Sequence, residues 1–163
     1  MDKIIAGDCL DVLPTLPPQS VKLVFTSPPY PGQKGNGQSV SEWLDWLNRV
    51  VAQIRPLLVD SAVIALNVMF KRTESGWFDT RLFSAVPLLF ESNGFHCLDA
   101  YIWHKTNVPQ NGPLSYCDAP GYEPVYVYTN AGRPGTLLSM LNTNLMRQKV
   151  SAAMARRVSD TAA

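Results

Sequence analysis

The chain has 163 residues, of which 46% are hydrophobic and 17% charged, and its formal net charge is +1. This length suits one domain with a sizeable core. The near-neutral charge excludes a uniformly basic protein, so any nucleic-acid surface would be local. Cys9, Cys97 and Cys117 form no CxxC pair, which argues against a zinc site or a disulfide framework and predicts reduced intracellular thiols. No apolar run is long enough to span a membrane, and we expect a cytoplasmic protein.

The first part of the chain alternates short apolar runs with turns. Residues 3–6 predict a short strand that ends at Gly7-Asp8, and residues 9–16 predict a helical turn. Residues 21–26 (VKLVFT) are rich in β-branched and aromatic side chains, and they predict a buried strand. The polar, glycine-rich residues 31–38 then predict a loop.

The following part of the chain alternates helices and strands. Ser39 and Glu42 have the spacing of a capping box, and behind them apolar residues repeat at helical intervals. A second helix is expected over residues 80–92, closed by Asn93-Gly94. Strands are expected over residues 61–68, 95–105 and 123–129. This alternation predicts an α/β sheet with helices packed against it.

The stretch Ser27-Pro28-Pro29-Tyr30 directly follows the strand over residues 21–26. Proline lacks a backbone donor and fixes φ, so two prolines end strand pairing and make a stiff turn. In open α/β sheets, ligands bind beyond the carboxyl ends of the strands. Both this turn and Asp8 follow a predicted strand. The position therefore predicts a binding site, with a purely structural turn as the alternative.

The sequence TSPPY after an apolar strand resembles the catalytic motif of the DNA amino-methyltransferases, which use S-adenosylmethionine to methylate an exocyclic nitrogen of adenine or cytosine. Three stretches resemble the circularly permuted branch of that family, whose catalytic half precedes its cofactor half: IIAGDCLDVLPTLPPQSVKLVF, YIWHKTNVPQNG and YEPVYVYTN. The resemblance covers about residues 4–130. It implies a partial Rossmann-like sheet with helices on both faces, S-adenosylmethionine as cofactor, and duplex DNA with a flipped-out base as partner.

The resemblance assigns the chemistry to the turn. An amino group conjugated to a base ring is a poor nucleophile, but acceptors placed around it can take its hydrogens and free its lone pair. The Ser27 side chain and the Pro28 carbonyl are expected to be these acceptors, with Pro28 and Pro29 fixing the carbonyl direction. Tyr30 is expected to stack on the flipped-out base. No thiolate nucleophile is required, and no cysteine has the setting of one.

The resemblance also places residues beside the cofactor. Asp8 matches the family's acidic residue near the cofactor's adenine, and Cys9 and Tyr30 are expected to border the same molecule. The alternative for Asp8 is the N-cap of a helix that begins at Cys9.

Three residues are candidate DNA contacts. Trp103 and Lys105 would border the target-base pocket or contact a phosphate, and their alternatives are a core tryptophan and a solvated lysine. Lys34 would touch the DNA backbone, or it is simply an exposed loop lysine. Glu123 could pair with a basic group in the fold.

The chain departs from the family after Thr129. The permuted branch continues with a strand and a glycine-rich loop of the DPFxGSG type, which binds the methionine part of the cofactor, and neither follows here. Residues 1–130 therefore predict a catalytic half, and residues 131–163 a basic amphipathic helix or tail. Without the strands of the cofactor half, the strand over residues 21–26 would expose an apolar edge or pair with residues 3–6. An exposed edge favours a homodimer or a completing chain.

The residue before the two prolines bears on the target base. Family members with Ser in this position commonly modify cytosine N4, whereas those with Asp commonly modify adenine N6, so Ser27 favours cytosine. One alternative is a truncated or partner-completed subunit that binds DNA or another protein without catalysis. Another keeps the chemistry but acts on RNA or on a protein glutamine.

Overall fold

The structure, a computed structural model, describes residues 3–32, 36–69, 79–105 and 121–131. The chain divides into two compact units, residues 1–131 and residues 132–163, and the second lies outside the described residues. The predicted amphipathic tail therefore lies outside the described residues, and so does Cys117, which falls between residues 105 and 121. Within the described part, no helix is long and apolar enough to cross a membrane.

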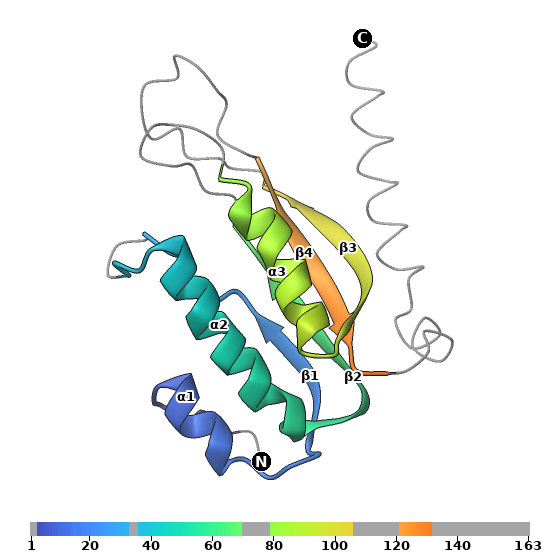
Figure 1. The fold of residues 1–163 in the computed structure, drawn as a ribbon. Coiled ribbons are helices and arrows are strands. Elements are labelled where there is room, and N and C mark those ends of the chain that lie inside the picture. Colours follow the sequence, from blue (N-terminus) through green and yellow to red (C-terminus); the bar gives the residue numbers. More distant parts are fainter. Residues whose placement is uncertain (1–2, 33–35, 70–78, 106–120, 132–163) are drawn as a thin grey trace, which may run out of the picture. The chain divides into compact units, whose positions relative to one another are not determined.

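Four strands of the described residues form one sheet in the order β1-β2-β4-β3 (Figure 1). They are β1 (Val21–Thr26), β2 (Leu58–Asn67), β3 (His96–His104) and β4 (Tyr122–Thr129). β1 pairs with β2 in parallel, whereas β4 runs antiparallel to both β2 and β3. The carboxyl ends of β1 and β2 therefore lie side by side, and β4 begins next to them because it runs the other way.

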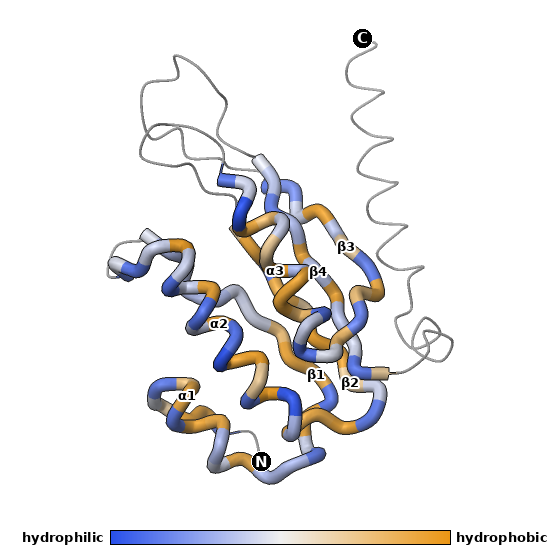
Figure 2. The backbone as a smooth tube through the Cα atoms, viewed as in Figure 1, coloured by the Kyte–Doolittle hydropathy of each residue, from blue (hydrophilic) through white to orange (hydrophobic). Residues whose placement is uncertain are grey.

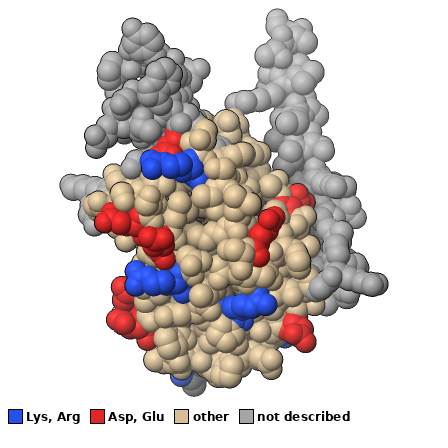
Figure 3. Space-filling model, viewed as in Figure 1, with Lys and Arg blue, Asp and Glu red and all other residues tan. Residues whose placement is uncertain are grey.

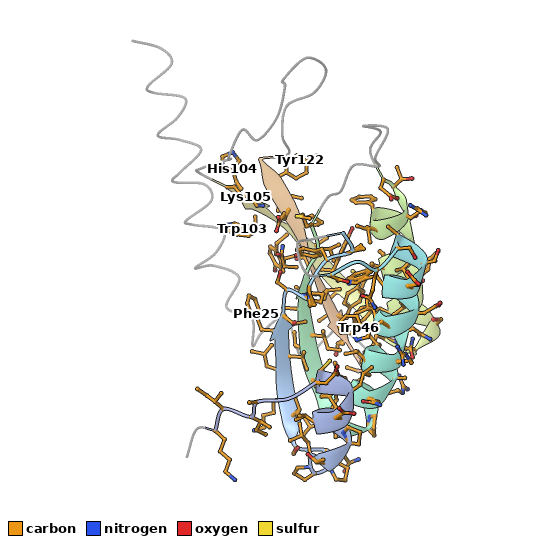
Figure 4. All side chains as sticks on the ribbon, turned by 90° about the vertical axis from the view of Figure 1, so that its left-hand side faces the viewer. Phe25, Trp46, Trp103, His104, Lys105 and Tyr122 are labelled. Atoms are coloured by element: carbon orange, nitrogen blue, oxygen red, sulfur yellow. The ribbon has the colours of Figure 1, made fainter. Side chains whose placement is uncertain are left out.

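The described helices lie on one face of this sheet, as Figure 4 shows in side view. They are α1 (Cys9–Val12), α2 (Val40–Ile54) and α3 (Arg81–Ser92), with the 3-10 turns η1 (Leu13–Thr15) and η2 (Arg55–Leu57). The α/β class is thus as expected. Helices on both faces were predicted, but in the described residues they cover only one face.

The helix α2 begins at the capping box that its sequence predicts. The Ser39 side chain accepts a hydrogen bond from the Glu42 backbone at 3.2 Å, and the Glu42 carboxylate accepts one from the Ser39 backbone at 2.8 Å. This capping box satisfies donors that the helix itself leaves open. The apolar side of α2 is buried, and it consists of Val40, Trp43, Leu47, Val50, Val51 and Ile54. The predicted cap at the end of α3 is also present, because Asn93 is its C-cap and Gly94 has a φ of +76°.

The core lies between the helices and the strands β2 and β4. Figure 2 shows hydrophobic residues along these strands and on the inner sides of the helices. Trp43 from α2 and Tyr128 from β4 are both 0% exposed, and Phe90 from α3 stacks on Tyr128 with ring centroids 4.1 Å apart. Burial of such large rings supplies much of the stability of a small domain.

The other face of the sheet has no described helix over it. The strand register places Leu23 opposite Val63 and Phe25 opposite Ala65 on this face. Leu23 is 60% exposed and Phe25 is 76% exposed. We call this surface the open face. It continues across the sheet as far as Tyr101 and Trp103, which pair with Val125 and Glu123.

The short strand expected over residues 3–6 is wrong. These residues form no strand, and Ile4 is 101% exposed. A four-residue apolar run becomes a strand only when a neighbour offers it hydrogen bonds, and β1 pairs with no described strand other than β2. The other expectation, an apolar edge at β1, matches the described sheet.

Candidate active site

The turn after β1 is held by a cluster of hydroxyl and amide groups. The Ser27 and Tyr30 hydroxyl oxygens lie 2.8 Å apart, and the Ser27 hydroxyl donates to Asn67 Oδ1 at 3.2 Å. The Tyr30 hydroxyl lies 3.1 Å from both Asn67 Oδ1 and the Asn67 backbone oxygen. Because β1 and β2 are parallel, Asn67 at the end of β2 meets the turn that ends β1. Ser27 itself is exposed, so its hydroxyl is open to a ligand.

Side chains from the following segment brace the turn from behind. The Trp43 indole N–H donates to the Pro29 carbonyl at 2.7 Å, and the Asn36 amide donates to the Tyr30 carbonyl at 3.0 Å. Among the described residues, none of these hydrogen bonds engages the Pro28 carbonyl. These contacts hold the turn at Pro29 and Tyr30, whereas the Ser27 hydroxyl bonds to Tyr30 and Asn67 and remains exposed.

Tyr30 occupies a different place from the one expected for a stacking residue. Its side chain belongs to the hydrophobic core and is 5% exposed. Burial raises the pKa of the Tyr30 phenol, opposed by hydrogen bonds from Ser27 and the Met69 backbone. Its ring thus supports the turn from beneath. Stacking on a base would require the ring to leave this position.

Sequence reasoning did not single out Asn67. It contacts Ser27 from 40 residues away along the chain, and its Nδ2 donates to the Pro124 carbonyl at 3.2 Å. The available signal was a polar residue at the end of the strand SAVIALNV, which neighbours the TSPPY strand. An amide that ends a buried strand needs partners, and here they come from the turn and from β4.

Asp8 caps the helix α1. Its carboxylate accepts a hydrogen bond from the Leu10 backbone at 2.8 Å, which is the N-cap alternative considered for it. Cys9 is half-buried, and burial together with the charge of Asp8 raises the pKa of its thiol. A raised pKa keeps the thiol protonated, so Cys9 is unsuited to nucleophilic attack.

Trp103, Lys105 and Glu123 form a second polar group beside the turn. Glu123 is buried and forms an ion pair with Lys105, whose ammonium lies 5.4 Å from the centre of the Trp103 ring. Trp103 is 53% exposed, so the alternative of a core tryptophan is wrong. Lys105 is not a freely solvated lysine either, because Glu123 holds it. Figure 4 shows Trp103 and Lys105 at the same end of the sheet as Tyr122.

The charge of Glu123 links this group to the turn, since it contributes to the raised pKa of Tyr30. The candidate contact Lys34 lies outside the described residues. Figure 3 looks onto the helix-covered face, where acidic and basic side chains are interspersed and no basic cluster is seen among the described residues. The described residues also contain no group of three or more His, Cys, Asp or Glu that could hold a metal ion.

Comparison with known proteins decides the family. The family model described as DNA methylase, for the N6 and N4 methyltransferases, matches residues 21–162. The chain belongs to this family. Its match runs through β1, the TSPPY turn, all four strands and the residues beyond Thr129.

Individual members of the DNA methylase family show the same relationship. The type II methyltransferase M.SfiI of Streptomyces fimbriatus is 27% identical over 155 residues, which cover 80% of this chain and 36% of that protein. TTHA0409 of Thermus thermophilus, complexed with S-adenosyl-L-methionine, is 27% identical with a TM-score of 0.63, covering 78% of this chain and 52% of that one. PvuII DNA methyltransferase, specific for cytosine N4, has the same fold at 17% identity and a TM-score of 0.67, covering 76% of this chain and 47% of that one.

The methylase chain thus spans about a third of the curated relative and about half of the solved structures. This ratio bears on the cofactor. The described residues include Ser27 and Pro28, the two acceptors that the sequence predicts. Toward S-adenosylmethionine they offer Asp8, whose carboxylate already caps α1, and no glycine-rich loop that could hold the methionine part. The described residues therefore do not by themselves fit the cofactor.

Proposed function

We propose that this chain provides the base-binding half of a DNA amino-methyltransferase, which transfers a methyl group from S-adenosylmethionine to the exocyclic amino nitrogen of a flipped-out base. The observation that carries the proposal is the exposed Ser27 hydroxyl, held by Tyr30 and Asn67 at the carboxyl end of β1. It stands beside a proline carbonyl in a rigid turn. The family membership supports the same reaction.

The turn is suited to activating an amino group without a charged base. Ser27 Oγ and the Pro28 carbonyl can accept the two amino hydrogens and favour a pyramidal nitrogen whose lone pair is available. S-adenosylmethionine would supply a methyl group whose bond to the sulfonium sulfur breaks to release a neutral thioether, a good leaving group. The part of the rate that this chain can provide is then positioning and preorganised dipoles. The groups in contact with Ser27 are a phenol and an amide, and the raised pKa of Tyr30 keeps it neutral near pH 7.

We further propose cytosine N4 as the target atom. The support is Ser27 itself, because family members with Ser at this position commonly act on cytosine N4. The raised pKa values of the Cys9 and Cys97 thiols, each due first to burial, count against attack by these cysteines on a cytosine ring carbon.

For DNA contact we propose Trp103, Lys105 and Lys34. The half-exposed ring of Trp103 can stack on a base or pack on a sugar, and such stacking is worth ~1–3 kcal/mol per base. Glu123 compensates the charge of Lys105, so Lys105 positions Trp103 more than it neutralises phosphate. The logarithm of DNA affinity should therefore fall only slowly with the logarithm of salt concentration.

The test is the identity of the methylated nucleoside. The chain is expressed in a host without DNA methylation of its own, and the host DNA is digested and analysed by mass spectrometry for N4-methylcytosine and N6-methyladenine. Ser27→Ala should lower methylation by about 10²-fold or more, the scale for losing a preorganised polar contact. Ser20→Ala is the matched control, since Ser20 is an exposed serine at the opposite end of β1 that bonds to Pro17 O.

The outcomes separate the proposals. N4-methylcytosine that disappears in Ser27→Ala supports both the reaction and the target. N6-methyladenine would reject the choice of cytosine but keep the reaction. Equal, detectable methylation by Ser27→Ala and by the unaltered protein would reject the role of the turn. No methylation by the unaltered chain would reject activity of the chain alone and favour a subunit that another polypeptide completes.

A second candidate function is a subunit that is active only when a further polypeptide completes it. The open face and the unpaired edge of β1 favour it, because apolar strands buried on one side only invite association. We expect weak or undetectable binding of S-adenosylmethionine by this chain alone, measured by calorimetry with and without duplex DNA. A tight, stoichiometric complex with the monomer would contradict this expectation.

A further inference from the structure

Asn67 joins the catalytic turn to β4 and is only 7% exposed. Its Nδ2 donates to the Pro124 carbonyl at 3.2 Å, and because a carbonyl can only accept, this contact fixes the orientation of the amide. Oδ1 then faces the hydroxyls of Ser27 at 3.2 Å and Tyr30 at 3.1 Å. Both hydroxyls therefore face the acceptor atom of the Asn67 side chain, and neither faces its NH2 group.

The hydroxyl protons can be followed through this cluster. Ser27 and Tyr30 carry one hydroxyl proton each, and Asn67 offers two acceptors, Oδ1 and its backbone oxygen. Between Ser27 and Tyr30 either hydroxyl can donate, and the Met69 backbone donates to the Tyr30 oxygen, a contact that opposes the effect of burial on the pKa of Tyr30. Among the described residues, the partners for the Ser27 proton are Tyr30 and Asn67, and both lie on the inner side of the turn.

We propose that Asn67 is a positioning residue that makes Ser27 Oγ a hydrogen-bond acceptor toward the target amino group, an inference that rests on the proposed amino-methyltransferase function. With its proton turned inward, the exposed Ser27 oxygen presents its lone pairs outward, where an amino N–H can donate to them. A reversed amide would donate to Ser27 and turn the Ser27 proton outward against the amino group. The orientation of the Asn67 amide therefore decides whether Ser27 accepts a hydrogen bond from the amino group or turns its own proton toward it.

The first experiment compares Asn67→Leu with Asn67→Asp in a preparation that methylates DNA. Asn67→Leu removes the acceptor at nearly constant size, and kcat should fall by roughly 10–100-fold, the scale for losing the residue that orients a catalytic group, with little change in KM for DNA. Asn67→Asp keeps acceptors toward both hydroxyls but cannot donate to Pro124, and it should restore most of kcat. If the contact with Pro124 were the whole role of Asn67, Asp would be as damaging as Leu.

A matched control separates this role from a structural one. Thr129 is 1% exposed and donates to the Ala62 backbone at 3.0 Å in the same sheet. Thr129→Val should lower the urea midpoint of unfolding and leave kcat unchanged. Normal kcat in Asn67→Leu, or an Asn67→Asp variant no better than Asn67→Leu, would overturn the proposal.

A second experiment needs no methyl transfer. In Ser27→Cys, the thiol would donate to Asn67 Oδ1, which favours the neutral form and raises the pKa of the thiol. The pKa is read from the pH dependence of alkylation at position 27, followed by mass spectrometry of its peptide. Adding Asn67→Ala should lower this pKa and speed alkylation at neutral pH, and an unchanged or higher pKa would overturn the proposal. A lower pKa would uphold the orientation of Asn67 whether or not the preparation transfers methyl groups, so a failure of the proposed function is read separately, from the methylation assay.

Discussion

The two faces of the sheet belong to the same four strands, but helices cover only one of them among the described residues. On the helix-covered face, Trp43, Phe90 and Tyr128 are all at most 1% exposed. On the open face, Phe25 and Trp103 are 76% and 53% exposed among the described residues. Figure 4 shows the side chains of the first face packed under the helices, while Phe25 and Trp103 point away from them.

This difference separates the parts of the site that the chain provides by itself from those it does not. Among the described residues, two contacts that hold the Ser27 turn come from the covered layer: Trp43 of α2 donates to Pro29, and Tyr30 is part of the core. Strands that are apolar on both faces are typical of sheets buried on both sides. The contacts that hold the proposed acceptors therefore lie within the described layer, and we expect a second layer to pack on the open face.

The largest expected effect tests the covered face. Trp43→Ala removes a fully buried ring and should lower the free energy of unfolding by ~3–5 kcal/mol, as for other large-to-small core changes. Trp43→Phe keeps most of the burial but loses the hydrogen bond to Pro29, and should cost about 0.5–1.5 kcal/mol. Urea unfolding followed by circular dichroism measures both. Equal losses in the two variants would show that the hydrogen bond, not the buried ring, fixes α2 to the turn.

The ion pair at the edge of the open face should give the next largest effect. Glu123 has 6% side-chain exposure and Lys105 has 26%, so the two partners are buried unequally. Lys105→Met leaves a buried carboxylate without its partner and should cost up to ~3 kcal/mol, at the lower end of values for broken buried pairs. Glu123→Gln leaves a lysine that can reach water and should cost less. If Glu123→Gln were the more damaging change, the buried group that needs compensation would be the lysine.

The sequence predicted the covered layer well because its signals are local. The strand over residues 21–26 has the bounds of β1, and the capping box at Ser39 is present with both of its hydrogen bonds. Local patterns of this kind depend on neighbours within a few positions. The turn was found for the same reason, because two prolines after an apolar strand are a local signal.

The features that the sequence missed depend on distant residues. Asn67 reaches Ser27 only because β2 lies beside β1, and no local sequence pattern predicts which strands are neighbours. Trp103 was weighed as a core residue, but β3 is an edge strand with one face open among the described residues, so its ring is exposed. Residues 3–6 have an apolar pattern yet form no strand, since strand formation needs a partner.

A smaller effect concerns a polar atom on the covered face. The Tyr128 hydroxyl is buried without a hydrogen-bond partner in the part of the chain that the structure describes, and burial raises the pKa of its phenol strongly. Tyr128→Phe removes this unsatisfied group and should raise the free energy of unfolding by about 1 kcal/mol at neutral pH. The ring keeps its stacking on Phe90. A loss of stability in thermal unfolding would mean that the hydroxyl has a partner after all.

The same tyrosine gives a pH dependence with a definite sign. Because the folded-state pKa is raised, the unfolded chain releases the phenol proton first as pH rises, so native stability falls above pH ~10. Tyr128→Phe should weaken this alkaline loss. Tyr30 and Tyr126, whose pKa values burial also raises, should account for part of what remains.

The smallest effect on stability is expected on the open face, where the effect on association should be the larger one. Leu23 and Phe25 are mostly exposed on β1, so changing both to Ser should alter the free energy of unfolding by only ~0.5 kcal/mol, as at other surface positions. We expect the apolar edge to drive self-association, so the double variant should reduce it, as measured by sedimentation over a range of concentrations. Leu88→Ser is a suitable control, since Leu88 is 64% exposed on α3, on the opposite side of the sheet. A large loss of stability in the Leu23 and Phe25 variant, with association unchanged, would mean that the open face is packed within the chain itself. The sheet would then have two covered faces, and the difference between them would disappear.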